Sequence, residues 1–357
     1  FLLFAESRGL LPTWNPVFRK GYSIASLRAS AERPGRHDGV WETLQAISRM
    51  AHTGCRLDDL HVSAFNGRLF SPARAALADG VRADDELVGR AIAALTTRIG
   101  PSGRERIAFR DLGVEELGAV YESLLDYAPV VLPAASATAA AAKAPLVKLA
   151  GTGTKRKSSG TFYTPVAITD YVVRETLGPL VDEASPDDIL RLKVVDPAMG
   201  SGAFLVAACR YLAESYERAL VRHSGRMASD ITDDERSSFR RLIARRCLYG
   251  VDINPMAVQV ARLSMWLTTL AADRPLTFLD HHFAAGDSLV GASIDDVGRQ
   301  RPGPSRTRWR GADELPFDPE EFGAAMRRAL PVREGLALAS DDSAGGVHEK
   351  EIALRQL

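Results

Sequence analysis

Three carboxylates in the middle of the chain each follow a short apolar run, and glycines surround the first of them. Asp196 opens the stretch Asp-Pro-Ala-Met-Gly-Ser-Gly-Ala-Phe-Leu (196–205), Asp252 follows Leu-Tyr-Gly-Val, and Asp287 follows Phe-Ala-Ala-Gly. A carboxylate accepts hydrogen bonds from cationic or hydroxylated ligands. Glycines let the backbone approach a ligand where a Cβ would clash. These residues are therefore candidates for binding a polar small molecule.

The apolar spacing around the glycines predicts the elements that hold them. Residues 192–195 indicate a short buried strand, and residues 203–220 carry apolar side chains at helical spacing. A strand, a glycine turn and a helix form the nucleotide-type site that α/β sheets build at the carboxyl ends of their strands. We therefore predict an α/β sheet, with Gly200 and Gly202 in the turn.

Two further strands are predicted after this turn. Residues 247–253 indicate a buried strand ending in Asp252, followed by a helix that begins at Asn254-Pro255. In nucleoside-binding α/β folds, an acidic residue at this place binds ribose hydroxyls. The sequence separation between Asp196 and Asp252 exceeds the roughly 20 residues of a compact dinucleotide fold. An additional helix, begun by the capping box Thr232-Asp-Asp-Glu235, accounts for the excess.

The third predicted strand lies near residues 276–285 and ends before Asp287 and Ser288, which are placed to read an adenine edge. His281 and His282 are adjacent in this stretch. On a strand, adjacent side chains point to opposite faces, so the two imidazoles cannot chelate one ion. We predict no metal site.

A helix start is predicted at Gly160-Thr-Phe-Tyr-Thr-Pro165, with Thr164 as N-cap and Pro165 at the first helical position. One interpretation is a capped helix and nothing more. The other is that its free N–H groups and positive dipole end hold a ligand carboxylate. The residues alone leave both interpretations open.

The flanks carry no catalytic spacing. Residues 1–128 predict a helical N-terminal domain, with helices over 40–51, 84–99 and 114–127. Residues 129–159 are rich in alanine, glycine and polar side chains, which predicts a flexible linker. Its basic run Lys155-Arg156-Lys157 either touches phosphate or is simply solvated.

The core is predicted over residues 160–293, and residues 294–357 form an incomplete insertion followed by helical segments. Arginines cluster around Trp309 in this last segment. A cationic, aromatic loop is suited to nucleic acid, and a disordered insertion explains the composition equally well. The candidate nucleic-acid contacts are Arg306, Arg308 and Arg310.

The composition is that of an ordinary globular protein without a membrane helix. The 357 residues are 46% hydrophobic and 25% charged, with 45 basic and 45 acidic side chains, so net charge alone favours no polyanionic partner. Cys209 and Cys247 fall on apolar positions, as buried thiols do, and three cysteines without metal spacing fit a reducing cytoplasm. No apolar span is long enough for a membrane helix. The chain begins without Met or a signal-peptide pattern, as expected of a fragment.

Taken together, the motifs resemble the amino-methyltransferases that modify adenine at N6 in DNA. The resemblance is closest to the Eco57I-like, type IIG restriction-modification methylases. Residues 160–165 resemble their motif X, residues 196–205 motif I, Gly250-Val-Asp-Ile-Asn-Pro-Met-Ala257 motif II, and Gly286-Asp-Ser-Leu289 motif III. The order X, I, II, III is that of the γ-type arrangement. Residues 114–125 are similar to the helix that precedes the methylase domain.

The resemblance implies a Rossmann-like S-adenosylmethionine-dependent methyltransferase sheet preceded by a helical domain. Tyr163 and Thr164 would then meet the methionine end of S-adenosylmethionine. Four residues of the glycine stretch would meet its amino-acid portion and sulfonium region: Asp196, Ala198, Gly200 and Gly202.

Three residues at the ends of the second and third strands would hold the nucleoside. By the same resemblance, Asp252 would accept from the ribose hydroxyls and Ile253 would pack on the adenine. Asp287 would accept from the adenine N6. The implied partners are double-stranded DNA and subunits of a restriction or phage-defence system, without a membrane.

One family motif is missing from the sequence. The Asn or Asp followed by Pro-Pro-Tyr or Pro-Pro-Phe of motif IV, which holds the flipped target adenine in this family, occurs nowhere in the 357 residues. A target-recognition domain is missing too. The expectation is therefore the cofactor-binding part of a site-specific DNA adenine-N6 methyltransferase, inactive by itself.

Three alternatives stay open at this point. The first is a non-catalytic subunit that binds cofactor or scaffolds DNA, and the second is a methyltransferase acting on RNA or protein. The third, a nicotinamide dehydrogenase, fits less well because Ala203-Phe204 departs from the third glycine of the dinucleotide-binding fingerprint.

Overall fold

A computed structural model of the chain describes residues 2–7, 9, 11–32, 38–62, 64, 70–72, 80–101, 103–109, 127–132, 146–151, 164–225, 227–269, 279–290, 319–340 and 342–355. All structural statements below concern these residues.

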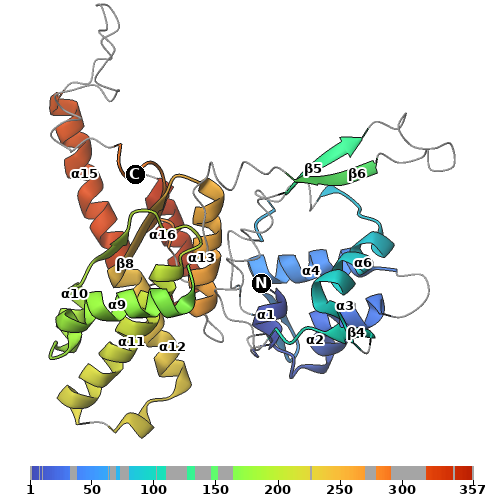
Figure 1. The fold of residues 1–357 in the computed structure, drawn as a ribbon, viewed down its shortest axis with the longest axis horizontal. Helices are drawn as coiled ribbons and strands as arrows, with labels where there is room; N and C mark the ends of the chain where they lie inside the picture. The colour runs from blue at the N-terminus through green and yellow to red at the C-terminus, as the bar shows by residue number, and fades with distance from the viewer. Residues whose placement is uncertain are drawn as a thin grey trace, which may run out of the picture.

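A three-stranded parallel sheet lies at the centre of the second half of the chain (Figure 1). Its strands are β7 (Val194–Asp196), β8 (Leu248–Asp252) and β9 (Phe283–Ala285), in the order β7-β8-β9. In the parallel register, Asp196 lies opposite Gly250, and Asp252 lies opposite Ala285. The carboxyl ends of the three strands therefore meet at one edge of the sheet. The predicted α/β class is confirmed at this level.

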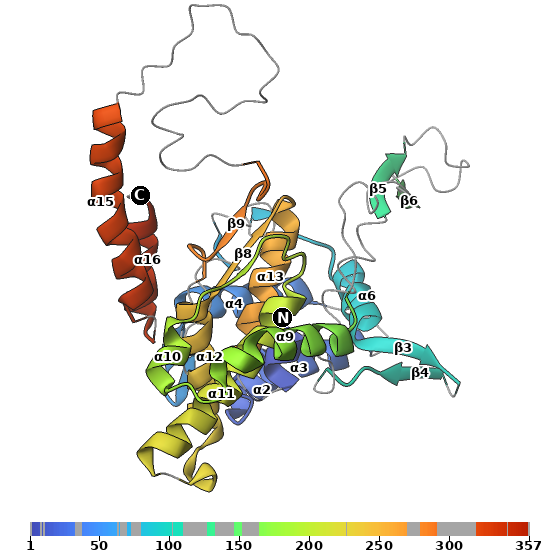
Figure 2. The same ribbon diagram turned by 60° about the vertical axis from the view of Figure 1, so that its left-hand side comes forward.

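Helices connect the strands and pack beside the sheet (Figures 1 and 2). Their bounds are α9 Val166–Val181, α10 Pro186–Arg191, α11 Ala203–Ser224, α12 Asp233–Cys247 and α13 Pro255–Thr268. A short 3-10 helix, Ala228–Asp230, lies between α11 and α12.

Local capping explains where these helices begin. Thr232 accepts from the Glu235 amide while the Glu235 carboxylate accepts from the Thr232 amide, so the predicted capping box of α12 is confirmed. Asn254 accepts from the Met256 amide, and Pro255 occupies the first position of α13, as predicted.

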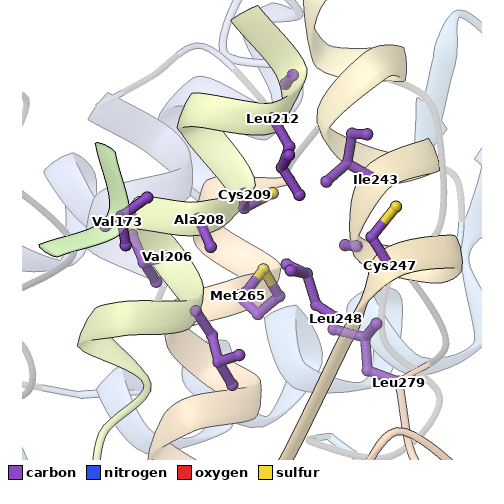
Figure 3. Close-up of a cluster of buried hydrophobic side chains, with 14 of the residues drawn as sticks. Val173, Val206, Ala208, Cys209, Leu212, Ile243, Cys247, Leu248, Met265 and Leu279 are labelled. Atoms are coloured by element: carbon purple, nitrogen blue, oxygen red, sulfur yellow. The ribbon is translucent and has the colours of Figure 1, made fainter. Parts of the chain in front are cut away.

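The main hydrophobic core lies between β8 and the helices around it (Figure 3). Leu212 and Cys209 of α11 meet Ile243 and Cys247 of α12, and each is 0% exposed. Both thiols are buried as predicted, and burial raises the pKa of each to about 12. Leu248 of β8, Met265 of α13 and Val173 of α9 complete the layer.

The described residues between 2 and 106 form helices with two short hairpins. The helices are α1 Leu2–Ser7, α2 Pro16–Gly21, α3 Ile24–Ala31, α4 Val40–Thr53 and α6 Asp85–Thr96. The hairpins pair β1 (Cys55–Leu57) with β2 (Leu60–Val62), and β3 (Thr97–Gly100) with β4 (Gly103–Arg106). Two small cores hold this part, one around Phe18 and the other around Ile47.

The helix predicted over 84–99 differs from the observed one. Asp84 caps α6, but the helix ends at Thr96, and Ile99 lies in β3 with 90% of its surface exposed. Val88 and Ile92 pack against the core as expected. β-branched Thr97 and Ile99 favour the extended backbone of the hairpin over a further helical turn.

The predicted linker over 129–159 also differs in part. Strands β5 (Tyr127–Leu132) and β6 (Leu146–Gly151) pair antiparallel, with Leu132 opposite Leu146. The apolar runs Val130-Val131-Leu132 and Leu146-Val147 favour strands and border the alanine-rich stretch. Of the helix predicted over 114–127, residues 114–126 lie outside the described residues, as does the Lys155–Lys157 run, and Tyr127 lies in β5 rather than in a helix.

The last two helices are α15 (Pro319–Leu338) and α16 (Ala344–Arg355), which pack against each other. Leu336 and Lys350 are 2% exposed, and Arg241 of α12 approaches Asp342 at 3.9 Å. None of the helices over the described ranges is long and apolar enough to cross a membrane.

Candidate functional site

The turn after β7 adopts a backbone that glycine makes accessible. Gly200 and Gly202 have φ angles of 54° and 86°, in the left-handed region. The Met199 amide donates to the Val251 carbonyl at 3.0 Å, which ties the turn to β8. A Cβ on Gly202 would lie 3.2 Å from the Ala261 Cβ, so the absence of a side chain lets α13 approach the turn. β8 and α13 therefore both hold the turn in place.

Met199 packs on β8 at Gly250. Its side chain is 4% exposed and lies over Gly250, where an added Cβ would collide with the Met199 sulfur and the Leu205 Cδ1. Gly250 therefore gives room for the turn to lie flat on the strand. Without that room, Gly200 and Gly202 would be displaced from the strand ends.

Asp196 has one satisfied and one unsatisfied oxygen. Its Oδ1 accepts from the Ala198 amide at 3.1 Å, while its Oδ2 is buried and has no hydrogen-bond partner within the described part of the chain. Burial raises the pKa of the Asp196 carboxyl, the Ala198 amide lowers it, and the nearby Asp252 charge raises it further. A buried acceptor without a donor costs free energy, and a ligand donor would recover it.

Asp252 organises the edge of the sheet. Its Oδ2 accepts from the Gly200 amide at 2.9 Å and its Oδ1 accepts from the Asn254 amide at 2.8 Å. Its own carbonyl accepts from the Gly286 amide at 2.9 Å. Asp252 thus joins the glycine turn, the start of α13 and the end of β9. The carboxylate oxygens keep further lone pairs for ligand hydroxyls.

The nucleoside candidates lie next to Asp252. Ile253 is an apolar side chain with 66% of its surface exposed, directly after the strand end. Asp287 follows β9, and its Oδ1 accepts from the Leu289 and Val290 amides at 2.9 and 3.2 Å. The sequence did not indicate this local turn, although an Asp two residues before an amide is a common turn pattern.

The structure therefore brings seven of the predicted residues to one edge of the sheet. The residues that share the edge are Asp196, Ala198, Gly200, Gly202, Asp252, Ile253 and Asp287. Tyr163 lies outside the described residues, as do Arg306, Arg308 and Arg310.

The predicted N-cap at Thr164 is wrong. Helix α9 begins at Val166, Pro165 stands at the cap position with extended backbone angles, and no side chain caps the helix. Proline fixes its own φ and favours an extended residue before it, which accounts for the shift by one position. Thr164 remains at the edge of the described segment, immediately before α9.

The strand geometry predicted for the two histidines is wrong as well. His281 and His282 lie in the turn before β9, with ring centroids 4.2 Å apart, and the His282 ring stacks on Tyr249 at 4.4 Å. Burial lowers the pKa of His281 to about 3 and that of His282 to about 4. Neutral imidazoles suit this packed position, and the Leu248 carbonyl holds the His282 Nδ1 at 2.6 Å.

Comparison with known proteins gives the class of this site. Residues 183–285 match the family model for the DNA-methyltransferase domain of MmeI. The match spans all three strands of the sheet together with Asp196 and Asp252. This segment is thus similar to the DNA-methyltransferase domain of MmeI, and the resemblance to restriction-modification methylases is confirmed.

Individual relatives agree with this class. The chain is 25% identical over 258 residues to the putative type II restriction enzyme and methyltransferase RM.MjaORFECS2P of Methanocaldococcus jannaschii, across 58% of the chain and 19% of the relative. It is 32% identical over 145 residues to the adenine-specific methyltransferase PglX of Streptomyces coelicolor, across 38% and 10%. It is 25% identical over 139 residues to the type II restriction enzyme and methyltransferase RM.Eco57I of Escherichia coli, across 36% and 14%.

The matched part of the chain spans a fifth or less of the length of these relatives. Among solved structures, the type IIL restriction-modification enzyme MmeI in complex with DNA matches 83% of the chain and 36% of its own chain. That match has a TM-score of 0.46 and 16% sequence identity.

Proposed function

We propose that this chain is the S-adenosylmethionine-binding part of a site-specific DNA methyltransferase that modifies adenine at N6. The observation that carries the proposal is the Asp196 Oδ2, a buried acceptor without a partner in the described residues, beside the left-handed glycine turn and Asp252. The match to a methyltransferase domain and the relatives named above support the reaction class. A Rossmann-like methyltransferase sheet is the proposed architecture.

The residues at this edge fit the cofactor. The ammonium group of the methionine portion has donors for the Asp196 Oδ2, and the ribose hydroxyls can donate to the remaining lone pairs of Asp252. Exposed Ile253 offers an apolar surface for the adenine, and Asp287 retains its Oδ2 as an acceptor for N6. Ala198, Gly200 and Gly202 place backbone close to the ligand.

Two further residues would complete the methionine end of the site: Tyr163 and Thr164. When bound, S-adenosylmethionine supplies an electrophilic methyl group on sulfonium. The protein's contribution here is to bind and orient the ligand, because positioning of two reactants lowers the barrier of a transfer reaction. Asp196 and Asp252 also place negative charge near a cationic ligand.

The acceptor base is the other half of the reaction. No Asn or Asp followed by Pro-Pro and an aromatic residue occurs in the 357 residues, so nothing in this sequence matches the motif that would hold a flipped adenine. We therefore propose that this chain binds the cofactor and is inactive by itself. The same observation favours one alternative for the isolated chain, a cofactor-binding subunit without activity of its own.

Double-stranded DNA is the proposed substrate, and subunits of a restriction or phage-defence system are the proposed partners. Two of the relatives named above are described as restriction enzymes and methyltransferases, which supports DNA as the substrate. Three arginines stay candidates for contacts with the DNA phosphate backbone, because guanidinium groups bind phosphate in a bidentate way: Arg306, Arg308 and Arg310. The proposed location is cytoplasmic.

The experiment that tests this function measures base modification in cells. The complete protein that contains this chain is expressed, and the genomic DNA is digested and analysed for methylated nucleosides by mass spectrometry. N6-methyladenine with the wild-type protein and none with Asp196→Asn is the expected result. Methylated cytosine, or methylation of RNA without methylation of DNA, would overturn the assignment.

A further inference from the structure

Arg262 on α13 makes a set of polar contacts that the site described above does not use. Its Nη1 lies 3.3 Å from the Asp280 Oδ1, and both side chains are largely buried, with 13% and 5% of their surfaces exposed. Its Nη2 donates to the Phe283 carbonyl at 2.7 Å and lies 3.5 Å from the Asp280 carbonyl. One guanidinium therefore binds both the turn before β9 and the first residue of β9.

These contacts act on the outer edge of β9. The Gly250 amide donates to the His282 carbonyl at 3.0 Å, and the Gly286 amide donates to the Asp252 carbonyl at 2.9 Å. Because backbone groups alternate along a strand, the Phe283 carbonyl faces away from β8. Arg262 supplies the donor that a further strand would otherwise provide there.

The position of Arg262 in α13 connects the two sides of the site. Its neighbour Ala261 packs against Gly202, where an added Cβ would lie 3.2 Å away. Helix α13 runs beside both β8 and β9 (Figure 2). Two consecutive residues thus hold the glycine turn on one side and β9 on the other.

We infer that Arg262 is a positioning residue that sets where the segment after β9, Gly286-Asp287, lies relative to Asp252 and the glycine turn. The expected effect on ligand binding rests on the proposed function, in which Asp287 binds the adenine half of the ligand. Arg262 touches no ligand group in this assignment. It acts through Phe283 and the strand that begins there.

The chain offers a matched control. Arg236 on α12 donates to the Glu217 carboxylate from its Nε and Nη2 at 3.1–3.3 Å, and that carboxylate is 19% exposed. The Arg236→Gln change removes a more exposed ion pair, with 39% of the Arg236 side chain exposed, in another part of the same fold. Its effect shows what the loss of an arginine–carboxylate pair away from β9 does to the protein.

The first test needs no ligand. Amide hydrogen exchange is compared in the wild type, Arg262→Gln, Arg262→Lys and Arg236→Gln. In Arg262→Gln the Gly286 amide is expected to exchange at least tenfold faster while the Gly200 amide is unchanged. Arg262→Lys keeps the charge near Asp280, but a single ammonium does not reproduce the fork, so Gly286 exchange rises there too.

The second test uses two ligands, S-adenosylmethionine and 5′-methylthioadenosine, which lacks the amino-acid end. Calorimetry is expected to show at least tenfold weaker binding of both ligands to Arg262→Gln, by the same factor. Arg236→Gln is expected to bind both as the wild type does. A larger loss for S-adenosylmethionine than for 5′-methylthioadenosine overturns the inference, because the methionine side would then be disturbed.

The two proposals fail in different ways. If the wild type binds neither ligand, the proposed function fails, and the exchange of Gly286 still decides the role of Arg262. If Gly286 exchange in Arg262→Gln and Arg262→Lys equals that in Arg236→Gln, the positioning role is overturned. Should Arg262→Gln not fold, Arg262→Lys and Asp280→Asn provide the same comparison.

Discussion

The Asp252 carboxylate accepts a hydrogen bond from the Gly200 amide at 2.9 Å, across 52 residues of sequence. This bond makes Asp252 more than the end of a strand, because it holds the glycine turn that follows β7. The same carboxylate caps the start of α13 through Asn254. A residue expected to face a ligand thus also shapes the site that receives it.

Replacing Asp252 is expected to weaken cofactor binding strongly. Asp252→Ala removes acceptors for two amides and for the ribose, so we expect binding of S-adenosylmethionine to lose about 1–3 kcal/mol, the scale of hydrogen bonds to a charged group. Calorimetry measures the change. Asn254→Ala removes the side-chain cap of α13 and is expected to cost about 1 kcal/mol of stability with little change in affinity. Unchanged affinity in Asp252→Ala would refute the ribose assignment.

Asp196→Asn is expected to separate stability from binding. The raised pKa of this carboxyl means that the fold disfavours its charged form, so its contribution to stability is present at low pH and lost as pH rises through the folded-state pKa. At pH 7 the neutral amide removes a buried charge beside Asp252, so the unfolding free energy should rise.

The check on Asp196→Asn is paired measurement of denaturant unfolding and ligand affinity. The account predicts a more stable protein that binds S-adenosylmethionine at least tenfold more weakly. A variant that is both less stable and equally tight in binding would show that Asp196 has a purely structural role.

Acid pH is expected to destabilise the fold through the two histidines. Burial holds the pKa of His281 at about 3 and of His282 at about 4, below the ordinary value of 6.5, and the Lys350 charge acts in the same direction. Between the folded-state pKa values and 6.5, the unfolded chain binds more protons than the folded protein does. The free energy of unfolding therefore falls as pH decreases below about 6.5.

The pH effect can be assigned by comparing variants. Urea unfolding at several pH values should give a shallower loss of stability between pH 6.5 and 4 for His282→Asn than for the wild type. Asn can still donate to the Leu248 carbonyl, which the His282 Nδ1 contacts now. Identical slopes in the two proteins would exclude His282 as a source of the pH dependence.

Gly250→Ala is expected to disturb the site through the packing of Met199 on β8. A Cβ at this position collides with the Met199 sulfur and the Leu205 side chain, so overpacking should cost roughly 1–3 kcal/mol of stability and lift the glycine turn. The second change Met199→Ala should recover part of the loss, and a double-mutant cycle of unfolding free energies measures that coupling. Strictly additive effects would mean that Met199 does not cover Gly250.

Much of the site could be predicted because its signals are local. An apolar run followed by a carboxylate marked the ends of β7 and β8, and the capping box at Thr232 marked the start of α12. These patterns depend on a few neighbouring residues. The bond between Asp252 and Gly200 could not be predicted in this way, because it joins residues that only the folded sheet brings together.

The errors have similar physical causes. Helix α6 ends before Ile99 because a hairpin competes for the same residues. The histidines before β9 adopt a turn that stacks His282 on Tyr249, a contact between segments 33 positions apart in the numbering of the chain. The contacts of Arg262 with Asp280 and Phe283 could not be predicted either, because they join α13 to the turn and strand that follow it only in the folded chain.

The most direct test of the central claim is calorimetric titration of the protein with S-adenosylmethionine and, separately, with NAD. We predict saturable heat with S-adenosylmethionine that disappears in Asp196→Asn, and none with NAD. Saturable heat with NAD and none with S-adenosylmethionine would contradict the account.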